Sequence, residues 1–273
     1  MTWTSLRVRA PGRLAAAADA LFAAGAQGVH EEPESVVTHF PEGTDLDAVE
    51  ATVLAAVPGA TCERAATDPV DWSVHWQDKL SAHDLGAITI APTWLAGGLD
   101  PARTVVIDPG MAFGTGDHPT TRGAVRLLQD VVAPGLVVAD LGAGSAVLAI
   151  AAAKLGASRV FAIEYDGEAL PNAEENVRRN GVEGIVHLFE GDAGILLPLV
   201  APVDAIVANI ISSVLVELLP AMHAALPPGG RAVLSGILVE ERPSMLEALE
   251  ADRWRVERED AEEGWWSVTI RKA

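Results

Sequence analysis

The sequence has little that would place this protein in a membrane or an oxidising compartment. Its 273 residues include one cysteine, Cys62, which excludes an internal disulfide framework and leaves too few thiolates for a structural zinc site. No stretch approaches the roughly 20 uninterrupted apolar residues of a membrane-spanning helix. The opening residues, MTWTSLRVRAPGRL, show no basic region followed by an apolar run, so no secretory signal is visible. We therefore expect a cytoplasmic protein, with no membrane association, whose mature form begins near Met1.

Positive charge is also scarce. The chain has 19 Lys and Arg residues against 38 Asp and Glu residues, for a formal charge of −19. Nucleic-acid binding depends on clustered Lys and Arg, so we expect no direct contact with nucleic acid. The same balance suits a basic protein partner, and it is equally compatible with an acidic surface that only maintains solubility. We expect a monomer and no metal site.

The first 65 residues read as strand, helix, strand, strand, helix, strand, which is the ferredoxin-like α+β arrangement. Gly25 and the Pro58-Gly59 pair end the two helices. No catalytic cluster appears here, so residues 1–65 are predicted to form a small substrate-binding domain. The expected strands cover residues 3–9, 28–32, 35–40 and 61–65, and the expected helices cover residues 13–24 and 46–57.

A Trp-rich connecting segment follows at residues 66–98, with DWSVHWQDKL and a predicted strand, GAITIAP. Trp72 and Trp76 are four residues apart and share one face if the segment is helical. We interpret them as domain-packing residues in preference to a recognition surface. A mobile junction at residues 66–70 is expected to let the front domain present a substrate in more than one orientation.

Strands and helices alternate through the remaining domain, placed at residues 99–273. This pattern predicts a doubly wound α/β core, in which helices cover both faces of a mostly parallel sheet. The last two strands, separated by the acidic turn DAEEG, are expected to form a hairpin. The expected strands are VVIDP, LVVADLG, RVFAIEY, GIVHLFE, VDAIVAN, RAVLSGI, RWRVERE and WWSVTIRK, and the expected helices cover residues 120–132, 145–155, 169–180, 213–225 and 242–251.

The strongest functional signal is VVADLGAGSAVLAIAAAKLGA, a buried strand that runs into a Gly-rich turn and an Ala-rich helix. Gly142 and Gly144 permit close backbone approach, and the helix presents free amides that suit a ligand carboxylate. Asp140, at the end of the strand, is included in the predicted cofactor site. The dinucleotide pattern G-x-G-x-x-G requires glycine where this chain has Val147, which weighs against a nicotinamide-dependent oxidoreductase.

Three polar residues follow at the carboxyl ends of later strands. Glu164 is placed to accept both ribose hydroxyl hydrogens, and Asp192, in FEGDAG, to accept from an adenine amino group. Asn209, in IVANII, is expected to face the reactive end of the crevice. Open α/β sheets bind ligands at this edge, so the set predicts a nucleoside site. Taken alone, Asp192 or Asn209 would serve equally as a helix N-cap.

The segment DPGMAFGTGDHPTT, residues 108–121, closely resembles the signature of bacterial ribosomal protein methyltransferases that modify the eleventh protein of the large ribosomal subunit. The likeness extends to DWSVHWQ, IAPTW, NAEENVRRNGV, VANI, SGIL and EGWWSVTIRK, and covers the chain from Asp71 onward. It implies a front domain that binds the ribosomal protein and a seven-stranded class I core that binds S-adenosylmethionine. The implied cofactor contacts are Thr121, Gly142, Glu164 and Asn209, with Phe113 and Thr115 shaping the pocket.

The chain departs from the family pattern at three positions. Ala143 replaces the usual Cys or Thr, Ala146 replaces a third glycine, and Glu164 stands where Asp is commoner. These changes are small, and the longer carboxylate still reaches a ribose. We interpret His118, in the FGTGDHPTT segment, as a residue that fixes the turn and not as a proton-transfer group.

The resemblance implies methyl transfer from S-adenosylmethionine to lysine side-chain amines and the N-terminal amine of the ribosomal protein. No dedicated base is evident, so we expect Asn209 and backbone carbonyls to orient the amine and water to remove its proton. Catalytic residues stay unassigned. Three alternatives are open: a methyltransferase for another protein or a small amine, a non-catalytic nucleoside-binding module, and an NAD-dependent oxidoreductase.

Overall fold

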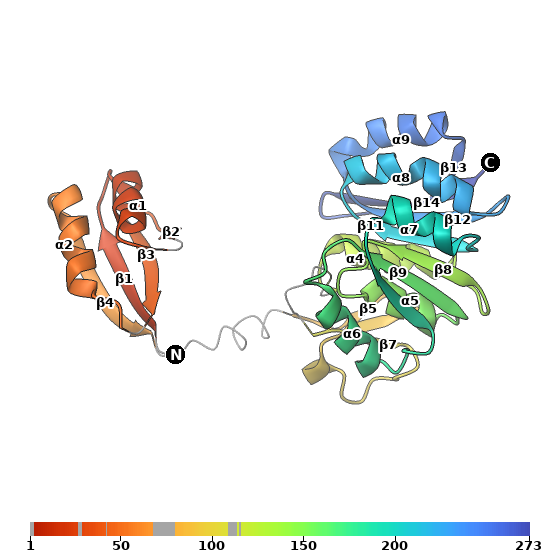
Figure 1. Cartoon of the computed structure of the whole chain (residues 1–273), viewed down its shortest axis with the longest axis horizontal. Helices are drawn as coiled ribbons and strands as arrows, with labels where there is room; N and C mark the ends of the chain where they lie inside the picture. The colour runs from red at the N-terminus through yellow and green to blue at the C-terminus, as the bar shows by residue number, and fades with distance from the viewer. Residues whose placement is uncertain (1–2, 27–28, 42, 68–79, 109–113, 115) are drawn as a thin grey trace. The chain divides into compact units, whose positions relative to one another are not determined.

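The computed structural model describes residues 3–26, 29–41, 43–67, 80–108, 114 and 116–273. The chain divides into two compact units, Met1–Lys79 and Leu80–Ala273 (Figure 1). Trp72 and Trp76 lie outside the described residues, as does most of the 66–70 junction, although the last strand of the first unit reaches Thr67.

The first unit has the predicted ferredoxin-like fold. Its antiparallel sheet has the order β2-β3-β1-β4, so the two βαβ halves are interleaved. Leu6 and Val36 from the sheet pack with Leu21 and Val53 from the helices in one apolar core. The elements are β1 (Trp3–Arg9), α1 (Leu14–Ala23), β2 (His30–Glu31), β3 (Ser35–Pro41), α2 (Leu46–Ala56) and β4 (Thr61–Thr67).

A small separate sheet opens the second unit, with the order β5-β6-β7. The expectation that VVIDP belongs to the main sheet is wrong, because β7 (Thr104–Val106) pairs with β6 (Thr89–Ala91) instead. The side-chain amide of Asn180 accepts from the Val106 N–H and donates to the Val106 carbonyl, both at 2.8 Å. The Asn180 side chain therefore occupies the N–H and C=O groups of Val106, which could otherwise form hydrogen bonds with a neighbouring strand. The short strand β5 covers His83–Asp84.

The main sheet has seven strands in the order β10-β9-β8-β11-β12-β14-β13, and this confirms the expected class I core. Six strands run in the same direction, and β14 alone is antiparallel, lying between β12 and β13. The predicted hairpin is present, but its turn is only Glu263–Gly264, with φ of 49° and 83°. The strands are β8 (Val137–Leu141), β9 (Arg159–Glu164), β10 (Val186–Glu190), β11 (Ala205–Asn209), β12 (Arg231–Leu238), β13 (Trp254–Glu262) and β14 (Trp265–Lys272).

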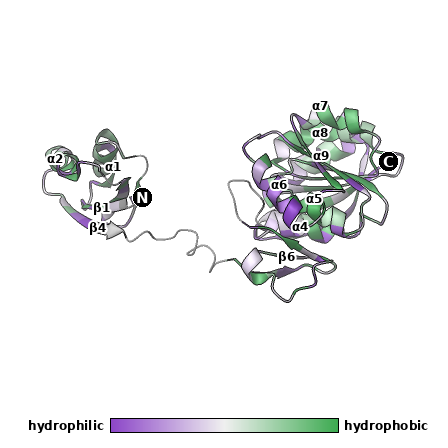
Figure 2. Cartoon of the chain, turned by 60° about the horizontal axis from the view of Figure 1, so that its bottom comes forward, coloured by the Kyte–Doolittle hydropathy of each residue, from purple (hydrophilic) through white to green (hydrophobic). Residues whose placement is uncertain are grey.

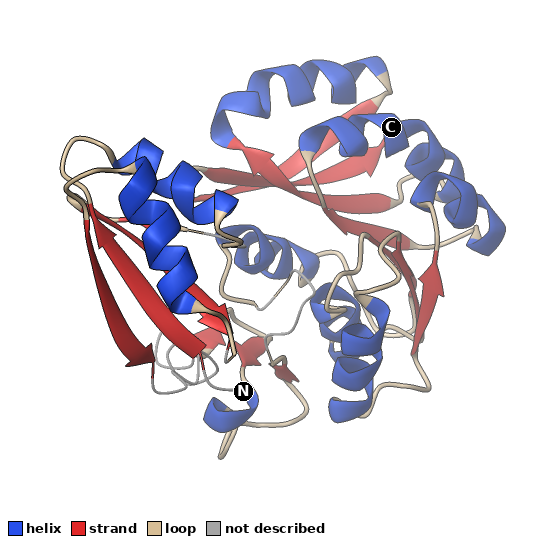
Figure 3. Cartoon of the chain, turned by 60° about the vertical axis from the view of Figure 1, so that its left-hand side comes forward, coloured by secondary structure: helices blue, strands red, loops and turns tan. Residues whose placement is uncertain are grey.

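Helices cover both faces of this sheet (Figure 3). One apolar cluster joins the sheet to residues of α4, α5 and α6, and a second joins it to residues of α7, α8 and α9. Within the described ranges, no helix has the length and apolar character needed to cross a membrane. The helices are α4 (Pro119–Leu128), α5 (Val147–Lys154), α6 (Leu170–Arg179), α7 (Ala193–Val200), α8 (Ser212–Ala225) and α9 (Arg242–Ala251).

Helix α7 is absent from the sequence-based prediction. It is eight residues long, contains Pro198, and is apolar along most of its length, as its green colour in Figure 2 shows. An apolar run of this length has no helical periodicity that would distinguish it from a buried strand. The Asp192 side chain starts the helix by accepting from the backbone N–H groups of Gly194 and Ile195.

Candidate active site

Two cavities of about 480 and 500 Å³ lie at the carboxyl edge of the seven-stranded sheet. Both are lined by Gly142, Glu164, Ile210 and Val214, so they are two parts of one crevice. We name them the Asn209 cavity and the Asp192 cavity after a residue that lines only one of them. The Asn209 cavity is also lined by His118, Thr120, Gly144, Ile211, Gly236 and Trp265.

The glycine turn forms the floor shared by the two cavities. Gly142 has φ of 73°, and a Cβ there would stand 2.3 Å from Ile210 Cγ2, so only glycine fits. Gly144 has φ of 52°. Ala146, at the position where the resemblance implies a third glycine, also adopts a left-handed φ of 65° and is fully buried. The chain thus keeps the backbone shape of a third glycine at some cost in strain.

The amides of this turn are not free. Those of Gly142 and Ala143 both donate to the Ile163 carbonyl, at 2.9 and 3.1 Å, and that of Gly144 donates to Glu164 Oε2 at 2.7 Å. Our expectation of free amides for a ligand carboxylate concerns the amino end of the helix that follows, α5, and stays a prediction. The three turn amides themselves are not available to a ligand. The amides instead tie the turn to the end of β9.

Glu164 is held in place by two backbone donors. Besides the Gly144 amide, its Oε1 accepts from the Asp166 N–H at 2.9 Å. Each carboxylate oxygen has two lone pairs, so both keep capacity for a further donor. Since Glu164 lines both cavities, the carboxylate stands where a ribose spanning the crevice would present its hydroxyl groups.

Asp140 is fully buried beneath the glycine turn. Neither carboxylate oxygen makes a hydrogen bond with a described residue. Burial raises the pKa of Asp140 to about 7, against the opposing influence of the nearby Ala149 backbone N–H, and the Glu164 charge adds to the rise. A buried acceptor without a donor is costly, which suits a site that is completed by a ligand carrying N–H or O–H groups.

Asn209 ends β11 and lines the Asn209 cavity. Its Nδ2 donates to Thr121 Oγ1 at 3.5 Å, whereas its buried Oδ1 has no partner among the described residues. The helix that follows begins after Ile211, so Asn209 is not an N-cap. Thr121 is completely buried behind Asn209, and its neighbour Thr120 lines the cavity instead.

Asp192 lines the Asp192 cavity and caps α7 at the same time. Oδ1 accepts from Gly194 N–H at 2.7 Å and from Ile195 N–H at 3.2 Å. The two roles considered at this residue are compatible, because one oxygen caps the helix and the second oxygen is available to accept from an adenine amino group.

His118 begins α4 and fixes its first turn. Nδ1 lies 2.8 Å from Thr120 Oγ1 and accepts from the Thr120 N–H at 3.4 Å. Burial, with the Arg122 charge as a second cause, lowers the pKa of His118, so the ring is neutral near pH 7. In the tautomer that accepts from Thr120, the proton sits on Nε2.

The structure brings Gly142, Gly144, Glu164, Asp192 and Asn209 together at one crevice, whereas Asp140 and Thr121 are completely buried and line neither cavity. Phe113 and Thr115 lie outside the described residues. Sequence reasoning did not assign Ile210, Val214, Gly236 or Trp265 to the site. The first two follow Asn209 closely, and the others stand in the SGIL and EGWWSVTIRK segments, so the resemblance was the available signal.

The sheet order, the glycine turn after β8 and the crevice at the strand ends define a class I, S-adenosylmethionine-dependent methyltransferase. The family model described as ribosomal protein L11 methyltransferase (PrmA) matches residues 18–273, and the chain belongs to this family. The ribosomal protein L11 methyltransferase of Thermus thermophilus is 39% identical over 249 residues, 90% of each chain. That of Desulforamulus reducens is 34% identical over 247 residues, 86% of this chain and 79% of that protein.

A solved structure gives the same result. The crystal structure of ribosomal protein L11 methylase from Lactobacillus delbrueckii subsp. bulgaricus is 32% identical to this chain. It superposes with a TM-score of 0.64, over 71% of this chain and 100% of that one.

Proposed function

We propose that this protein transfers methyl groups from S-adenosylmethionine to amines of ribosomal protein L11, including lysine side chains and the N-terminal amine. The observation that carries the proposal is the lining of the Asn209 cavity. The unpaired Oδ1 of Asn209, the glycine turn and Glu164 all face this one cavity. The names of the related proteins support L11 as the substrate.

The crevice residues fit this cofactor. We assign Glu164 to the ribose hydroxyls, the free oxygen of Asp192 to the adenine amino group, and the unpaired oxygens of Asp140 to the amino end of the cofactor. Gly142 and Gly144 keep the floor of the crevice free of side chains. When bound, the cofactor supplies an electrophilic methyl group carried on a sulfonium.

The enzyme has to present a neutral amine in line with that methyl group. Removing the proton from a lysine amine at pH 7 costs about 4.6 kcal/mol, whereas an N-terminal amine costs about 1 kcal/mol. The Asn209 cavity lowers the cost for lysine, because its Ile210, Ile211 and Val214 side chains disfavour a charged group. Asn209 Oδ1 accepts an N–H of the amine and so orients its lone pair.

His118 is not suited to act as the base. Its Nδ1 is used by Thr120, and in that tautomer Nε2 carries a proton and cannot accept another. We therefore propose that water removes the amine proton. The first unit is proposed to bind L11 as a basic partner of this acidic chain, without nucleic acid, and the enzyme to act as a cytoplasmic monomer.

Mass spectrometry of unmodified L11 tests the proposal directly. After incubation with enzyme and S-adenosylmethionine, L11 is expected to gain whole methyl groups, and peptide mapping is expected to locate them on lysines and the N-terminus. Binding of S-adenosylhomocysteine without any mass gain would indicate a non-catalytic module or another substrate. Binding of NAD in its place would indicate an oxidoreductase.

A further inference from the structure

Trp265 is a wall of the Asn209 cavity to which no role has yet been given. It is the first residue of β14, directly after the hairpin turn. Side chains alternate along a strand, and the next residue, Trp266, is buried with its Nε1 donating to Glu259 at 2.8 Å. Because the Trp266 side chain points into the buried face of the sheet, the Trp265 side chain points to the opposite face, where it lines the cavity.

Besides the unpaired Oδ1 of Asn209, which can accept only from a nitrogen that still carries hydrogen, the cavity has few groups that attract a cation. Apart from Glu164, which serves the ribose in our proposal, its lining is apolar or neutral, and Trp265 is its largest aromatic group. An indole face attracts an ammonium group and keeps doing so after the nitrogen has gained methyl groups, when hydrogen bonding has been lost. Ile211 and Val214 offer apolar surface for the aliphatic part of a lysine side chain.

The position of Trp265 is set by contacts on both sides. It pairs across the sheet with Leu238 of β12 and Glu262 of β13. Its ring meets the edge of the His118 ring, with centroids 5.0 Å apart and planes at 68°. Trp265 therefore lies between the start of α4 and the hairpin turn.

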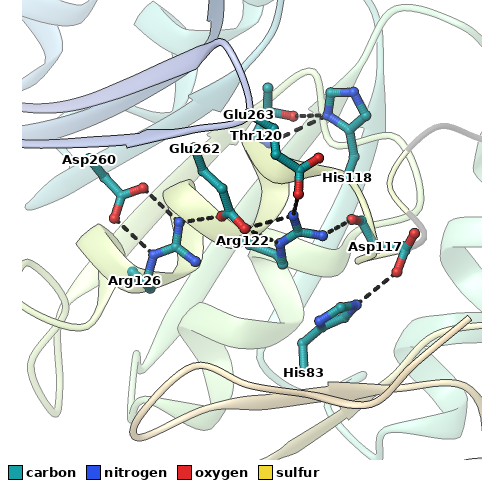
Figure 4. Close-up of polar contacts among 9 residues, drawn as sticks. All are labelled: His83, Asp117, His118, Thr120, Arg122, Arg126, Asp260, Glu262 and Glu263. Carbon is teal, nitrogen blue, oxygen red and sulfur yellow. Dashed lines mark hydrogen bonds and ion pairs between the residues drawn. The ribbon is translucent and has the colours of Figure 1, made fainter.

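Two arginines of α4 fasten that turn (Figure 4). Arg126 forms a two-pronged contact with Asp260, at 2.8 and 2.6 Å, and also reaches Glu262 Oε2 at 2.6 Å. Arg122 takes the other oxygen of Glu262 at 2.7 Å and contacts Glu263 at 3.2 Å. Glu262 is thus shared between both guanidinium groups, an arrangement that fixes direction as well as distance.

Arg122 links a third segment to this cluster. Its Nη1 donates to the Asp117 carbonyl, next to His118, and Asp117 in turn bonds His83 at 2.8 Å. The Arg122 side chain is only 10% exposed, whereas its partners Glu262 and Glu263 are 30% and 69% exposed, so solvent reaches the carboxylates and not the guanidinium. Arg122 consequently sets the spacing between His118 and the turn that carries Trp265.

We propose that Trp265 is a specificity-determining residue whose indole face binds the substrate nitrogen while it is charged, as the ammonium group before deprotonation and as the methylated cation after transfer, and that Arg122 is a positioning residue that acts through Trp265. This inference rests on the proposed methylation of L11 and assigns the surface that binds the reacting amine. It makes the hairpin turn part of substrate recognition and leaves the cofactor contacts to the glycine turn and Glu164.

Steady-state kinetics of the full-length enzyme with L11 test this, combined with calorimetry of S-adenosylhomocysteine binding. Trp265→Leu is expected to raise KM for L11 by about tenfold, the range of a desolvated cation–π contact, with kcat nearly unchanged. Trp265→Phe, which keeps an aromatic face, is expected to have a smaller effect. Both variants should bind S-adenosylhomocysteine as the wild type does.

The role of Arg122 is tested with a double-mutant cycle. Arg122→Gln is expected to raise KM for L11 in the wild-type background and to add little in the Trp265→Leu background. Arg122→Lys serves if Arg122→Gln does not fold, since one ammonium cannot bridge the partners of the guanidinium. Glu257→Gln is the matched control, because it breaks the ion pairs of β13 with Arg231 and Arg271 away from the turn.

Three results would overturn the inference. An unchanged KM in Trp265→Leu removes Trp265 from substrate binding, and an equal loss of S-adenosylhomocysteine affinity makes it a cofactor contact. If the double variant raises KM for L11 by the product of the two single effects, Arg122 acts independently of Trp265. A wild-type enzyme that leaves L11 unmodified is a different failure, because it removes the proposed function itself.

Discussion

The carboxylate of Glu164 accepts a hydrogen bond from the backbone amide of Gly144 at 2.7 Å, so the end of β9 is bonded to the glycine turn that follows β8. One contact thereby fixes the acidic group assigned to the ribose relative to the floor assigned to the amino-acid tail. The relationship couples the shape of the turn to the binding of the nucleoside.

Replacing this carboxylate is expected to weaken cofactor binding. Glu164→Gln keeps the volume but removes the charge-assisted bonds to two hydroxyl groups and turns an NH₂ group toward a backbone donor. The expected loss is about 2 to 4 kcal/mol in S-adenosylhomocysteine affinity, measured by calorimetry. Glu183→Gln, an exposed residue before the amino end of β10, is the control and should bind normally. Equal affinities of the two variants would contradict the assignment.

Asp140 makes the stability of the ligand-free protein depend on pH. Its pKa is about 7 in the fold against an ordinary value of 3.8, so between these values the folded state binds more protons than the unfolded state. Stability from this group is therefore lost as pH rises from about 4 to about 7 and is level above that. The loss is on the order of 4 kcal/mol.

Asp140→Asn removes this titration. Denaturant unfolding of the ligand-free variant is expected to show a flatter pH profile than the wild type and greater stability near pH 8. Its affinity for S-adenosylhomocysteine is expected to fall, because the charge that we assign to the amino end of the cofactor is absent. Parallel pH profiles of the two proteins would exclude Asp140 as the titrating group.

Gly142→Ala is expected to damage both stability and binding. The left-handed backbone alone costs about 1 to 2 kcal/mol, and the added methyl group also meets Ile210 at 2.3 Å. Gly135→Ala is a matched control, because Gly135 has φ of 90° but no atom within 4 Å of the added Cβ. Thermal unfolding and calorimetry should show a larger defect at Gly142, and binding should be lost only there. Equal losses of stability and of binding in Gly142→Ala and Gly135→Ala would contradict this, because the contact with Ile210 would then have no effect of its own.

The second unit should bind cofactor without the first. Residues 80–273 contain every described crevice residue and both of the apolar clusters around the main sheet. A chain of these residues is expected to keep its affinity for S-adenosylhomocysteine and to lose most of its activity on L11, as mass spectrometry would show. Full activity of the shortened chain would refute substrate binding by the first unit.

The sequence carried enough information for those parts of the site that depend on local order. The turn at Gly142 and the acid at Glu164 follow from a strand, a glycine pair and the end of the next strand. Thr120 was not assigned to the site, because a one-residue step turns a helix by about 100° and only packing decides which of two neighbouring side chains faces the cavity.

Other parts depend on contacts between distant segments. The main-sheet assignment of VVIDP was wrong because β7 pairs with β6, and the side chain of Asn180, 74 residues away, bonds the backbone of Val106. Trp265 was not assigned to the cavity because its place requires β14 to insert between β12 and β13. Neither relationship leaves a trace in the periodicity of the segments concerned.

The insertion of β14 has a consequence for the order in which the protein matures on the ribosome. Synthesis produces β13 before β14, yet β13 reaches the sheet only through pairing with β14. The nascent chain therefore carries the glycine turn and β8 to β12 while the hairpin edge is still missing. Until β14 has emerged, the Asn209 cavity lacks the Trp265 ring, so the proposed amine-binding surface is completed only after the glycine turn and β8 to β12.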